Sequence, residues 1–170
     1  ERVEQRVDVA ALLASTRKAH AGSAKGPTLT VNCESRAQIV GWLAEIESVV
    51  ANLLSNAMRH TPPEGKVTLT WRSSPEGAEL IVADTGEGIA AEHIPRLTER
   101  FFRVDSGRSR EDGGIGLGLA IVKHALERHD AKLEIHSQLG KGSTFICRFP
   151  PSRIAVDQPV PISAGTAVSP

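Results

Sequence analysis

The sequence predicts an amphipathic helix over residues 46–60, IESVVANLLSNAMRH. Apolar residues recur at the spacing of a stripe that faces a core, namely at Ile46, Val49, Val50, Leu53 and Ala57. At about 100° per residue, Asn52, Asn56 and Arg59 lie together on a strip beside that stripe. Asn is a poor residue inside a helix because its side chain competes for backbone hydrogen bonds.

This polar strip has two explanations that the helix alone does not separate. Amide oxygens are suited to Mg²⁺ and an arginine one turn further on is suited to phosphate, so the strip can be a ligand site. The same amides can instead be hydrogen-bonded at the edge between a helix and a sheet.

Length and composition fit a small globular protein. The 170 residues, 40% of them hydrophobic, suit one domain with short extensions. Lys and Arg total 20, as do Asp and Glu, so no basic field points to nucleic acid. No segment approaches the roughly 18 apolar residues of a membrane span, and residues 1–9 lack the apolar part of a signal peptide. Cys33 and Cys147 stand in strand-like segments, so we expect core cysteines and a reducing, cytosolic setting.

Further elements follow from the periodicity of the apolar residues. Helices are expected at residues 10–21 and 115–128, and the helix of residues 46–60 is expected to begin near residues 42–45. Strands are expected at residues 28–33, 66–72, 78–83, 133–136 and 144–149. Three helices and about five strands predict an α/β (α+β) two-layer sandwich, with the helices on one face of a mixed sheet. We place this domain at residues 1–150 and expect the Pro- and Ala-rich residues 151–170 to form a flexible tail.

Two glycine-containing segments stand where an element ends or begins. Residues 84–88, DTGEG, follow a strand, where a carboxylate can accept a hydrogen bond from an exocyclic amine. Taken alone, an ordinary Asp-x-Gly turn is the simpler explanation. Residues 113–118, GGIGLG, precede a helix and can offer backbone N–H groups to phosphates or act as a hinge. Their spacing fits neither a P-loop nor a Rossmann fingerprint.

A long loop joins these segments. Residues 84–114 contain five glycines and five arginines, with one short helix expected near residues 94–99. Loops of this length inside a domain are usually lids or disordered. Arg103, Arg108 and Arg110 can close over a terminal phosphate, although each alone is more often a surface charge. Residues 101–102, two phenylalanines, are expected to hold the loop against the body of the domain.

The order of these segments resembles a known family. An Asn-x-x-x-Asn helix, an Asp-x-Gly-x-Gly turn, a Phe-Phe-Arg loop, a Gly-x-Gly-x-Gly helix start and a Gly-Lys-Gly-Ser-Thr-Phe turn follow one another over residues 8–150. They resemble the five boxes of the Bergerat-type (GHKL) ATP-binding domain, shared by sensor histidine kinases, type II topoisomerases, ATPase chaperones and MutL. NLLSNAMRHTP and the stretch from HIPRL to HALERH resemble sensor histidine kinases, most of all those of the bacterial phosphate regulon.

The resemblance implies roles for individual residues. Asn56, together with Asn52, would bind Mg²⁺, and Arg59 and Arg103 would contact phosphates; Asn52, Asn56 and Arg103 would serve catalysis. His60 takes the place of an aromatic or histidine residue near the base. The further residues that the resemblance places around ATP are Asp84 (at the adenine amino group), Gly86, Gly88, Ile89, Phe102, Arg110, Gly114, Gly116, Leu117, Gly118, Leu119, Ser143 and Thr144.

Two features distinguish between branches of the family. Members that hydrolyse ATP place a glutamate base one turn before the metal-binding asparagine, where this chain has Asn52, which cannot take a proton. The phosphoacceptor motif, a histidine followed by an acidic residue and a later Arg-Thr-Pro, does not occur in the sequence. We expect plain surface or helix histidines at positions 20, 93, 124, 129 and 136.

The resemblance therefore implies a protein-histidine kinase domain that binds ATP and Mg²⁺. It would donate the γ-phosphoryl group to a histidine on a dimerisation domain outside this chain, without labelling itself. Expected partners are that domain, which gives a homodimer, and a response regulator; the expected setting is the cytoplasmic side of an inner-membrane sensor in phosphate-starvation signalling. The alternatives are a GHKL-type ATPase switch and a non-enzymatic nucleotide-binding regulator.

Overall fold

The computed structural model of the chain describes residues 3–22, 25–104 and 117–155. The elements in chain order are β1 (Gln5–Val7), α1 (Val9–His20), β2 (Thr28–Cys33), β3 (Gln38–Gly41), α2 (Leu43–His60), β4 (Lys66–Ser74), β5 (Gly77–Asp84), the 3₁₀ turn η1 (Ile94–Arg96), α3 (Gly118–Arg128), β6 (Lys132–Gln138), β7 (Gly142–Phe149), the 3₁₀ turn η2 (Pro151–Arg153) and β8 (Ile154–Ala155). Within this described part, no helix combines the length and the apolar character that crossing a bilayer requires.

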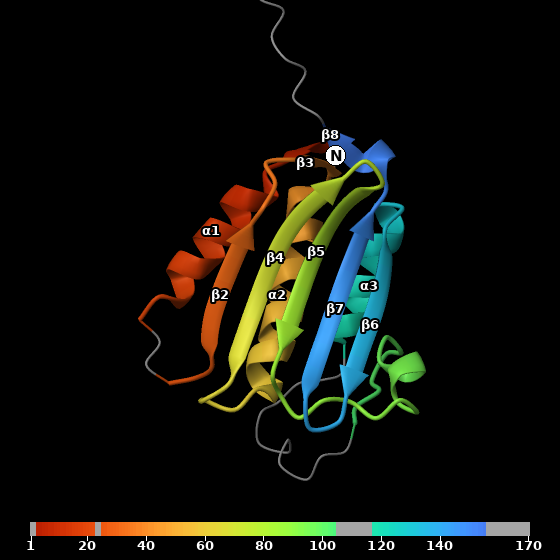
Figure 1. Cartoon of the computed structure of the whole chain (residues 1–170). Helices are drawn as coiled ribbons and strands as arrows, with labels where there is room; N and C mark the ends of the chain where they lie inside the picture. Colours follow the sequence, from red (N-terminus) through yellow and green to blue (C-terminus); the bar gives the residue numbers. More distant parts are fainter. Residues whose placement is uncertain (1–2, 23–24, 105–116, 156–170) are drawn as a thin grey trace, which may run out of the picture.

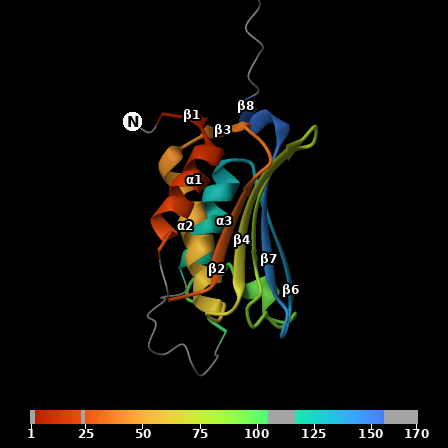
Figure 2. The ribbon, with the colours of Figure 1, turned by 60° about the vertical axis from the view of Figure 1, so that its left-hand side comes forward.

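The five longer strands form one mixed sheet with the order β2-β4-β5-β7-β6. Strand β2 runs parallel to β4, and the other neighbours are antiparallel. The helices α1, α2 and α3 cover one face of this sheet, and no described element covers the other face (Figures 1 and 2). The predicted two-layer α/β sandwich is therefore confirmed.

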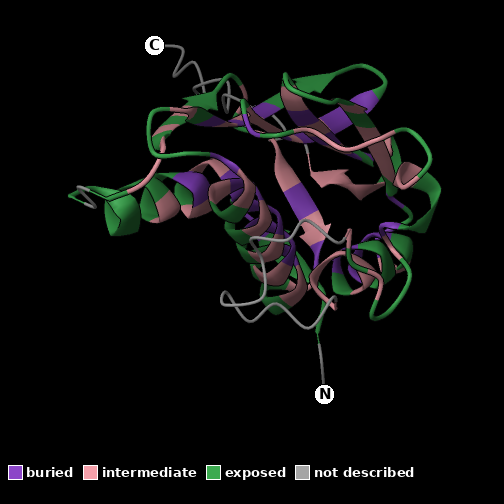
Figure 3. Cartoon of the chain, turned by 90° about the horizontal axis from the view of Figure 1, so that it is seen from below, coloured by how far each residue is buried: buried purple, intermediate pink, exposed green. Residues whose placement is uncertain are grey.

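The core lies between the helices and the sheet. The five apolar residues predicted to form the buried stripe of α2 are each at most 2% exposed. From the sheet side, Trp71, Phe145 and Phe149 are buried to a similar degree. Seen from below, the buried residues lie where helices and strands face each other (Figure 3). Burying a large apolar side chain stabilises a fold by about 1.5–3 kcal/mol, so this stripe fixes α2 and the polar strip beside it against the sheet.

The turn between β4 and β5 is shorter than the gap between the strands predicted at residues 66–72 and 78–83. Strand β4 continues to Ser74, and β5 begins at Gly77, which has φ +125°. A Cβ at Gly77 would lie 2.1 Å from the Phe149 carbonyl oxygen, so only glycine fits there.

A second, three-stranded sheet with the order β1-β3-β8 is not predicted from the sequence, because β3 and β8 are too short for alternation to be visible. This sheet connects both ends of the described chain to the segment that precedes α2. The Arg153 side chain adds ion pairs at 2.7 Å to Glu4 and 2.9 Å to Asp130. The first five residues of the predicted tail therefore belong to the fold, and residues 156–170 lie outside the described residues.

His129 is completely buried, so its prediction as a plain surface or helix histidine is wrong. Its Nδ1 lies 2.7 Å from the Ala125 carbonyl oxygen, and its Nε2 lies 3.1 Å from the backbone nitrogen of Trp42. A carbonyl oxygen only accepts and a backbone N–H only donates, so we assign the ring proton to Nδ1. The ring thereby ties the end of α3 to the residue that precedes α2.

The two cysteines differ in their environment. Cys147 is buried as predicted, and burial raises the pKa of its thiol to about 12. Cys33 is exposed, so the prediction of a core cysteine is wrong there, because β2 lies at the edge of the sheet.

Candidate functional site

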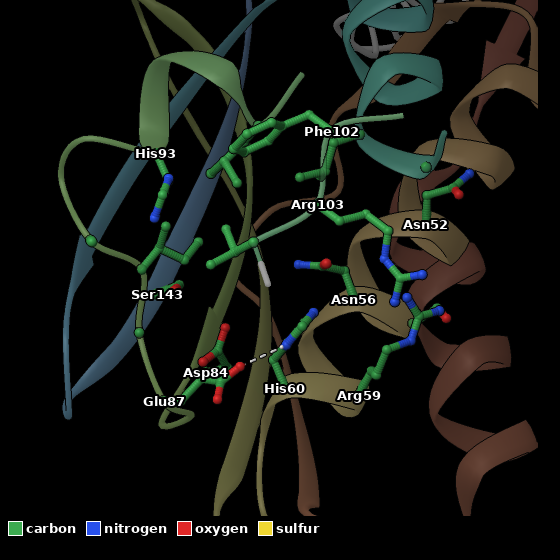
Figure 4. Close-up of a pocket in the computed structure, with 18 of the residues that line it drawn as sticks. Asn52, Asn56, Arg59, His60, Asp84, Glu87, His93, Phe102, Arg103 and Ser143 are labelled. Carbon is green, nitrogen blue, oxygen red and sulfur yellow. Dashed lines mark hydrogen bonds and ion pairs between the residues drawn. The ribbon is translucent and has the colours of Figure 1, made fainter. Parts of the chain in front are cut away.

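A cavity of about 550 Å³ opens at the end of the sandwich where α2 and β5 end and α3 begins. This volume is typical of sites for small molecules. Figure 4 shows Asn52, Asn56 and Arg59 on the α2 side and Asp84 and Ser143 on the strand side. The cavity therefore has two chemically different walls.

On the α2 wall, Asn52 is held in one orientation. Its Nδ2 donates to the backbone carbonyl of Ser48, one turn earlier, at 2.8 Å and lies 3.1 Å from the Ser48 hydroxyl oxygen. Because the carbonyl only accepts, the amide nitrogen must face it and the amide oxygen is directed elsewhere. A Cβ added to Gly118 would lie 2.9 Å from this oxygen, which places the oxygen at the start of α3.

Asn56 and Arg59 follow along the same strip. Among the described residues the Asn56 amide has no hydrogen-bond partner, and both side chains line the cavity. Arg103 extends toward this wall from the opposite loop (Figure 4). Two amides and two guanidinium groups thus lie together. The guanidinium groups suit an anionic ligand, and the amide oxygens suit a hard cation.

On the strand wall, Asp84 ends β5 and accepts a hydrogen bond from the Gly86 backbone N–H at 2.8 Å. Burial raises the pKa of this carboxyl above its usual range, while hydrogen bonds from the backbone N–H groups of Gly86 and Ser143 act in the opposite direction. A half-buried carboxylate that is not fully compensated is a candidate for ligand recognition.

The turn after Asp84 is packed closely against both of its neighbours. A Cβ at Gly86 would lie 2.2 Å from the His60 carbonyl oxygen, at the end of α2. Gly88 has φ +73°, and a Cβ there would lie 2.1 Å from the Gln138 carbonyl oxygen, at the end of β6. Glycines are therefore needed at both positions for the turn to bring the strand wall and the helix wall together.

Glu87 lies between these two glycines and connects the same walls. Its Oε1 lies 3.0 Å from Nδ1 of His60, and its backbone carbonyl accepts from the Gly140 N–H at 2.8 Å. Its backbone N–H donates to the His60 carbonyl at 3.3 Å. The pair of Glu87 and His60 thereby borders the cavity where the two walls meet (Figure 4).

The loop after this turn covers one side of the cavity. In place of the helix predicted near residues 94–99, only the three-residue turn η1 forms, with Pro95 at its start. Phe102 lines the cavity, and the Arg96 guanidinium lies 4.4 Å from the centre of its ring. Phe101 is 68% exposed with φ +65°, so the prediction that both phenylalanines hold the loop is wrong for Phe101.

The N-terminus of α3 supplies the remaining border. Leu117, Gly118 and Leu119 line the cavity, and α3 begins at Gly118. The first N–H groups of a helix have no partner within the helix and carry partial positive charge. They favour an anionic group at this end of the cavity.

The structure brings together most of the residues predicted around ATP. Those that line the cavity are Asn52, Asn56, Arg59, His60, Asp84, Gly88, Ile89, Phe102, Arg103, Leu117, Gly118, Leu119 and Ser143. Gly86 contacts the end of α2 instead, and Thr144 pairs with Ala83 on the opposite face of the sheet from Ser143, because neighbouring residues of a strand alternate. The predictions for Arg108, Arg110, Gly114 and Gly116 lie outside the described residues.

Several residues of the cavity were not predicted from the sequence. They are Ser55, Glu87, Ala90, His93, Leu97, Val104, Ile121 and Leu139. Helical spacing could have indicated Ser55, which stands one turn after Asn52, and Ile121, which stands one turn after Leu117. His93 and Leu139 reach the cavity only because the chain folds, and no local pattern in the sequence indicates them. Among the described residues, no three His, Cys, Asp or Glu side chains form a group that could hold a metal ion.

Comparisons with known proteins agree with this geometry. The family model of histidine kinase-, DNA gyrase B-, and HSP90-like ATPases matches residues 43–153. The phosphate regulon sensor protein PhoR of Pseudomonas aeruginosa is 50% identical over 151 residues, which cover 88% of this chain and 34% of that protein. The sensor-like histidine kinase SenX3 of Mycolicibacterium smegmatis is 36% identical over 146 residues, 85% of this chain and 38% of that protein. The chain thus spans about a third of the length of these curated relatives.

Solved structures give the same result. A mycobacterial sensor histidine kinase, MprB, matches with a TM-score of 0.74 at 30% identity, over 86% of this chain and 97% of that chain. Full-length ShkA in complex with AMPPNP matches with a TM-score of 0.74 at 27% identity, over 88% of this chain and 31% of that chain.

Proposed function

Since this chain belongs to the family of histidine kinase-, DNA gyrase B- and HSP90-like ATPases, on its sensor histidine kinase branch, we propose that it binds ATP with Mg²⁺ and donates the γ-phosphoryl group. The acceptor is a histidine on a dimerisation domain outside this chain. The observation that carries the proposal is one cavity with a hydrogen-bond-accepting strand wall and an amide and guanidinium helix wall. Adenine would meet hydrogen-bond acceptors at the strand wall, and a triphosphate would meet amide and guanidinium groups at the helix wall.

At the strand wall, the Asp84 carboxylate would accept a hydrogen bond from the exocyclic amine of adenine. One of its oxygens is already fixed by the Gly86 N–H, so the orientation of the carboxylate is set before the ligand arrives. The glycine at position 88 lets this turn pack directly against the end of β6, and His60 borders the same end of the cavity.

At the helix wall, the amide oxygens of Asn52 and Asn56 would hold Mg²⁺. The fit rests on the Asn52 oxygen, which its contact with Ser48 turns toward the start of α3. When bound, Mg²⁺ neutralises charge on the phosphates. The side chains of Arg59 and Arg103 and the first N–H groups of α3 would neutralise the rest and hold the triphosphate.

Transfer rather than hydrolysis follows from the lack of a base at Asn52. An amide cannot accept a proton from water, and the nitrogen of this amide is engaged by Ser48. Phosphoryl transfer needs mainly positioning and stabilisation of charge from the protein, which these residues can supply. Any base that assists the acceptor imidazole would come from the dimerisation domain.

The relatives suggest the biological setting. We propose a homodimeric sensor kinase with this domain on the cytoplasmic side of the inner membrane, a response regulator as the next phosphate acceptor, and phosphate-starvation signalling as the pathway, because PhoR of Pseudomonas aeruginosa is named a phosphate regulon sensor. In this proposal Arg110, Gly114 and Gly116 would also contact the nucleotide.

A reconstitution experiment tests the proposal. The purified chain is incubated with radiolabelled ATP and Mg²⁺, alone and with the separately purified dimerisation domain. We expect a phosphohistidine on the added domain and none on this chain. Steady release of phosphate by the chain alone would instead indicate an ATPase switch, and ATP binding without transfer would indicate a regulator.

A further inference from the structure

The register of the sheet places a row of side chains at the strand wall. Val67 pairs with Asp84, Asp84 with Ser143, and Ser143 with Ser137. Cross-strand partners point to the same face of a sheet, and Val67 belongs to the core, so the whole row faces the helices. Asp84 and Ser143 line the cavity, and Ser137 stands behind them on β6.

Ser137 has three polar contacts that together fix the direction of its proton. The Ile89 N–H donates to its Oγ at 2.8 Å, the Gly142 carbonyl oxygen lies 3.0 Å from it, and the Ser143 Oγ lies 2.8 Å from it. The carbonyl can only accept, so Ser137 must donate to Gly142 for that contact to be a hydrogen bond. Its single proton is then used.

The contact between the two serines therefore has a direction. With its proton on the Gly142 carbonyl, Ser137 can only accept from Ser143, and all three contacts are satisfied at once. The opposite direction would forfeit the bond to Gly142. Ser143, which is 6% exposed, then directs its hydroxyl proton to Ser137 and away from the cavity. Its oxygen can therefore only accept a hydrogen bond from a ligand.

We propose that Ser137 is a positioning residue for base selection, which acts by making Ser143 an acceptor. This inference rests on the proposed nucleotide site. Asp84 in its ionised form is also an acceptor only, so the strand wall offers acceptors from two neighbouring residues. An exocyclic amine carries two N–H donors and suits this edge, whereas a carbonyl oxygen at the same place would face lone pairs. Ser137 therefore favours a purine with an amine at position 6 although it does not line the cavity.

The test compares ATP with inosine triphosphate, in which a carbonyl replaces the amine. Affinities of the whole chain for both nucleotides, with Mg²⁺, are measured for the wild type and for Ser137→Ala. Without Ser137 the Ser143 hydroxyl can rotate and donate to the carbonyl. We expect the ratio of ATP affinity to inosine triphosphate affinity to fall about three- to tenfold, the size of one net hydrogen bond.

Three further variants separate positioning from a loss of structure. Ser137→Thr keeps the hydroxyl and should restore the ratio. Ser143→Ala removes the group that Ser137 orients, so adding Ser137→Ala to it should leave the ratio unchanged. Ser73→Ala is the matched control, because Ser73 forms a serine pair with Ser35 at 2.6 Å near the other end of β4 and should leave both affinities unchanged.

The inference would be overturned by a Ser137→Ala ratio within twofold of the wild type, whether both affinities stay unchanged or both fall equally. Failure of the wild-type chain to bind ATP would instead refute the proposed function, so the two failures are distinguishable.

Discussion

Replacing Asp84 by Asn tests the strand wall while keeping its shape. The variant retains an oxygen that can accept from the Gly86 N–H, which lies 2.8 Å from Oδ1 in the wild type. The other carboxylate oxygen becomes an NH₂ group, which cannot accept from the adenine amine.

The expected loss of ATP affinity follows from this exchange. A hydrogen bond to a charged group contributes about 1.5–3 kcal/mol, and each 1.4 kcal/mol is a factor of about ten in affinity. ATP should therefore bind about 10–150-fold more weakly in Asp84→Asn, measured by isothermal titration calorimetry with Mg²⁺. The upper part of the range is expected, because two N–H donors then face each other.

The same variant should be more stable than the wild type when no nucleotide is present. Burial raises the pKa of Asp84 in the folded chain, so its contribution to stability is full below the unfolded pKa and is lost as the pH rises through the folded pKa. Asn does not ionise and avoids that loss. We expect Asp84→Asn to melt at a higher temperature at pH 8, and the difference to close below about pH 4, near the usual pKa of Asp.

Asp130→Asn is the matched control, because Asp130 is exposed and pairs with Arg153 at 2.9 Å beyond the far end of α3. It should leave ATP affinity unchanged and cost at most about 1 kcal/mol of stability. The reasoning about Asp84 would be refuted by ATP affinity within twofold of the wild type. A lower melting temperature of Asp84→Asn at pH 8 would refute the argument from burial.

Three further substitutions test the helix wall and the core. Asn56→Ala should remove the Mg²⁺-dependent part of ATP affinity, whereas Asn32→Ala, at an exposed residue of β2, should not; calorimetry with and without Mg²⁺ tests both. Asn52→Asp loses the donor to a backbone carbonyl 2.8 Å away, so it should lower the free energy of unfolding by about 1–3 kcal/mol in urea titrations. Gly41→Ala would place a Cβ 2.3 Å from the buried ring of His129 and should cost roughly 2–5 kcal/mol; an unchanged melting temperature would contradict that packing.

Patterns that are local in the chain could be read from the sequence. The stripe of α2 and the polar strip beside it lie within 18 residues, so periodicity alone predicts which residues are buried and that Asn52 and Asn56 share a face. The strands of the large sheet have six to nine residues, long enough for alternation to be visible, and were predictable for the same reason. The family resemblance then added the order of the cavity-lining segments.

Features that depend on contacts between distant residues could not be predicted. His129 is buried among residues far from it in the chain, among them Trp42, 87 residues earlier, and no local pattern records these contacts. Strand β8 has two residues and becomes a strand only because β3 lies beside it. The ion pair of Arg153 with Glu4 joins the two ends of the described chain in the same way.

The choice between Ser143 and Thr144 shows how register decides a site. Both hydroxyls stand in one Gly-Lys-Gly-Ser-Thr-Phe turn, and the family resemblance places both around the nucleotide. On β7 the buried Phe145 fixes the inward face, and side chains alternate, so Ser143 points to the cavity and Thr144 points away from it. A slip of one residue would exchange the two and turn Phe145 out of the core. The packing energy of this phenylalanine therefore also determines which hydroxyl faces the cavity.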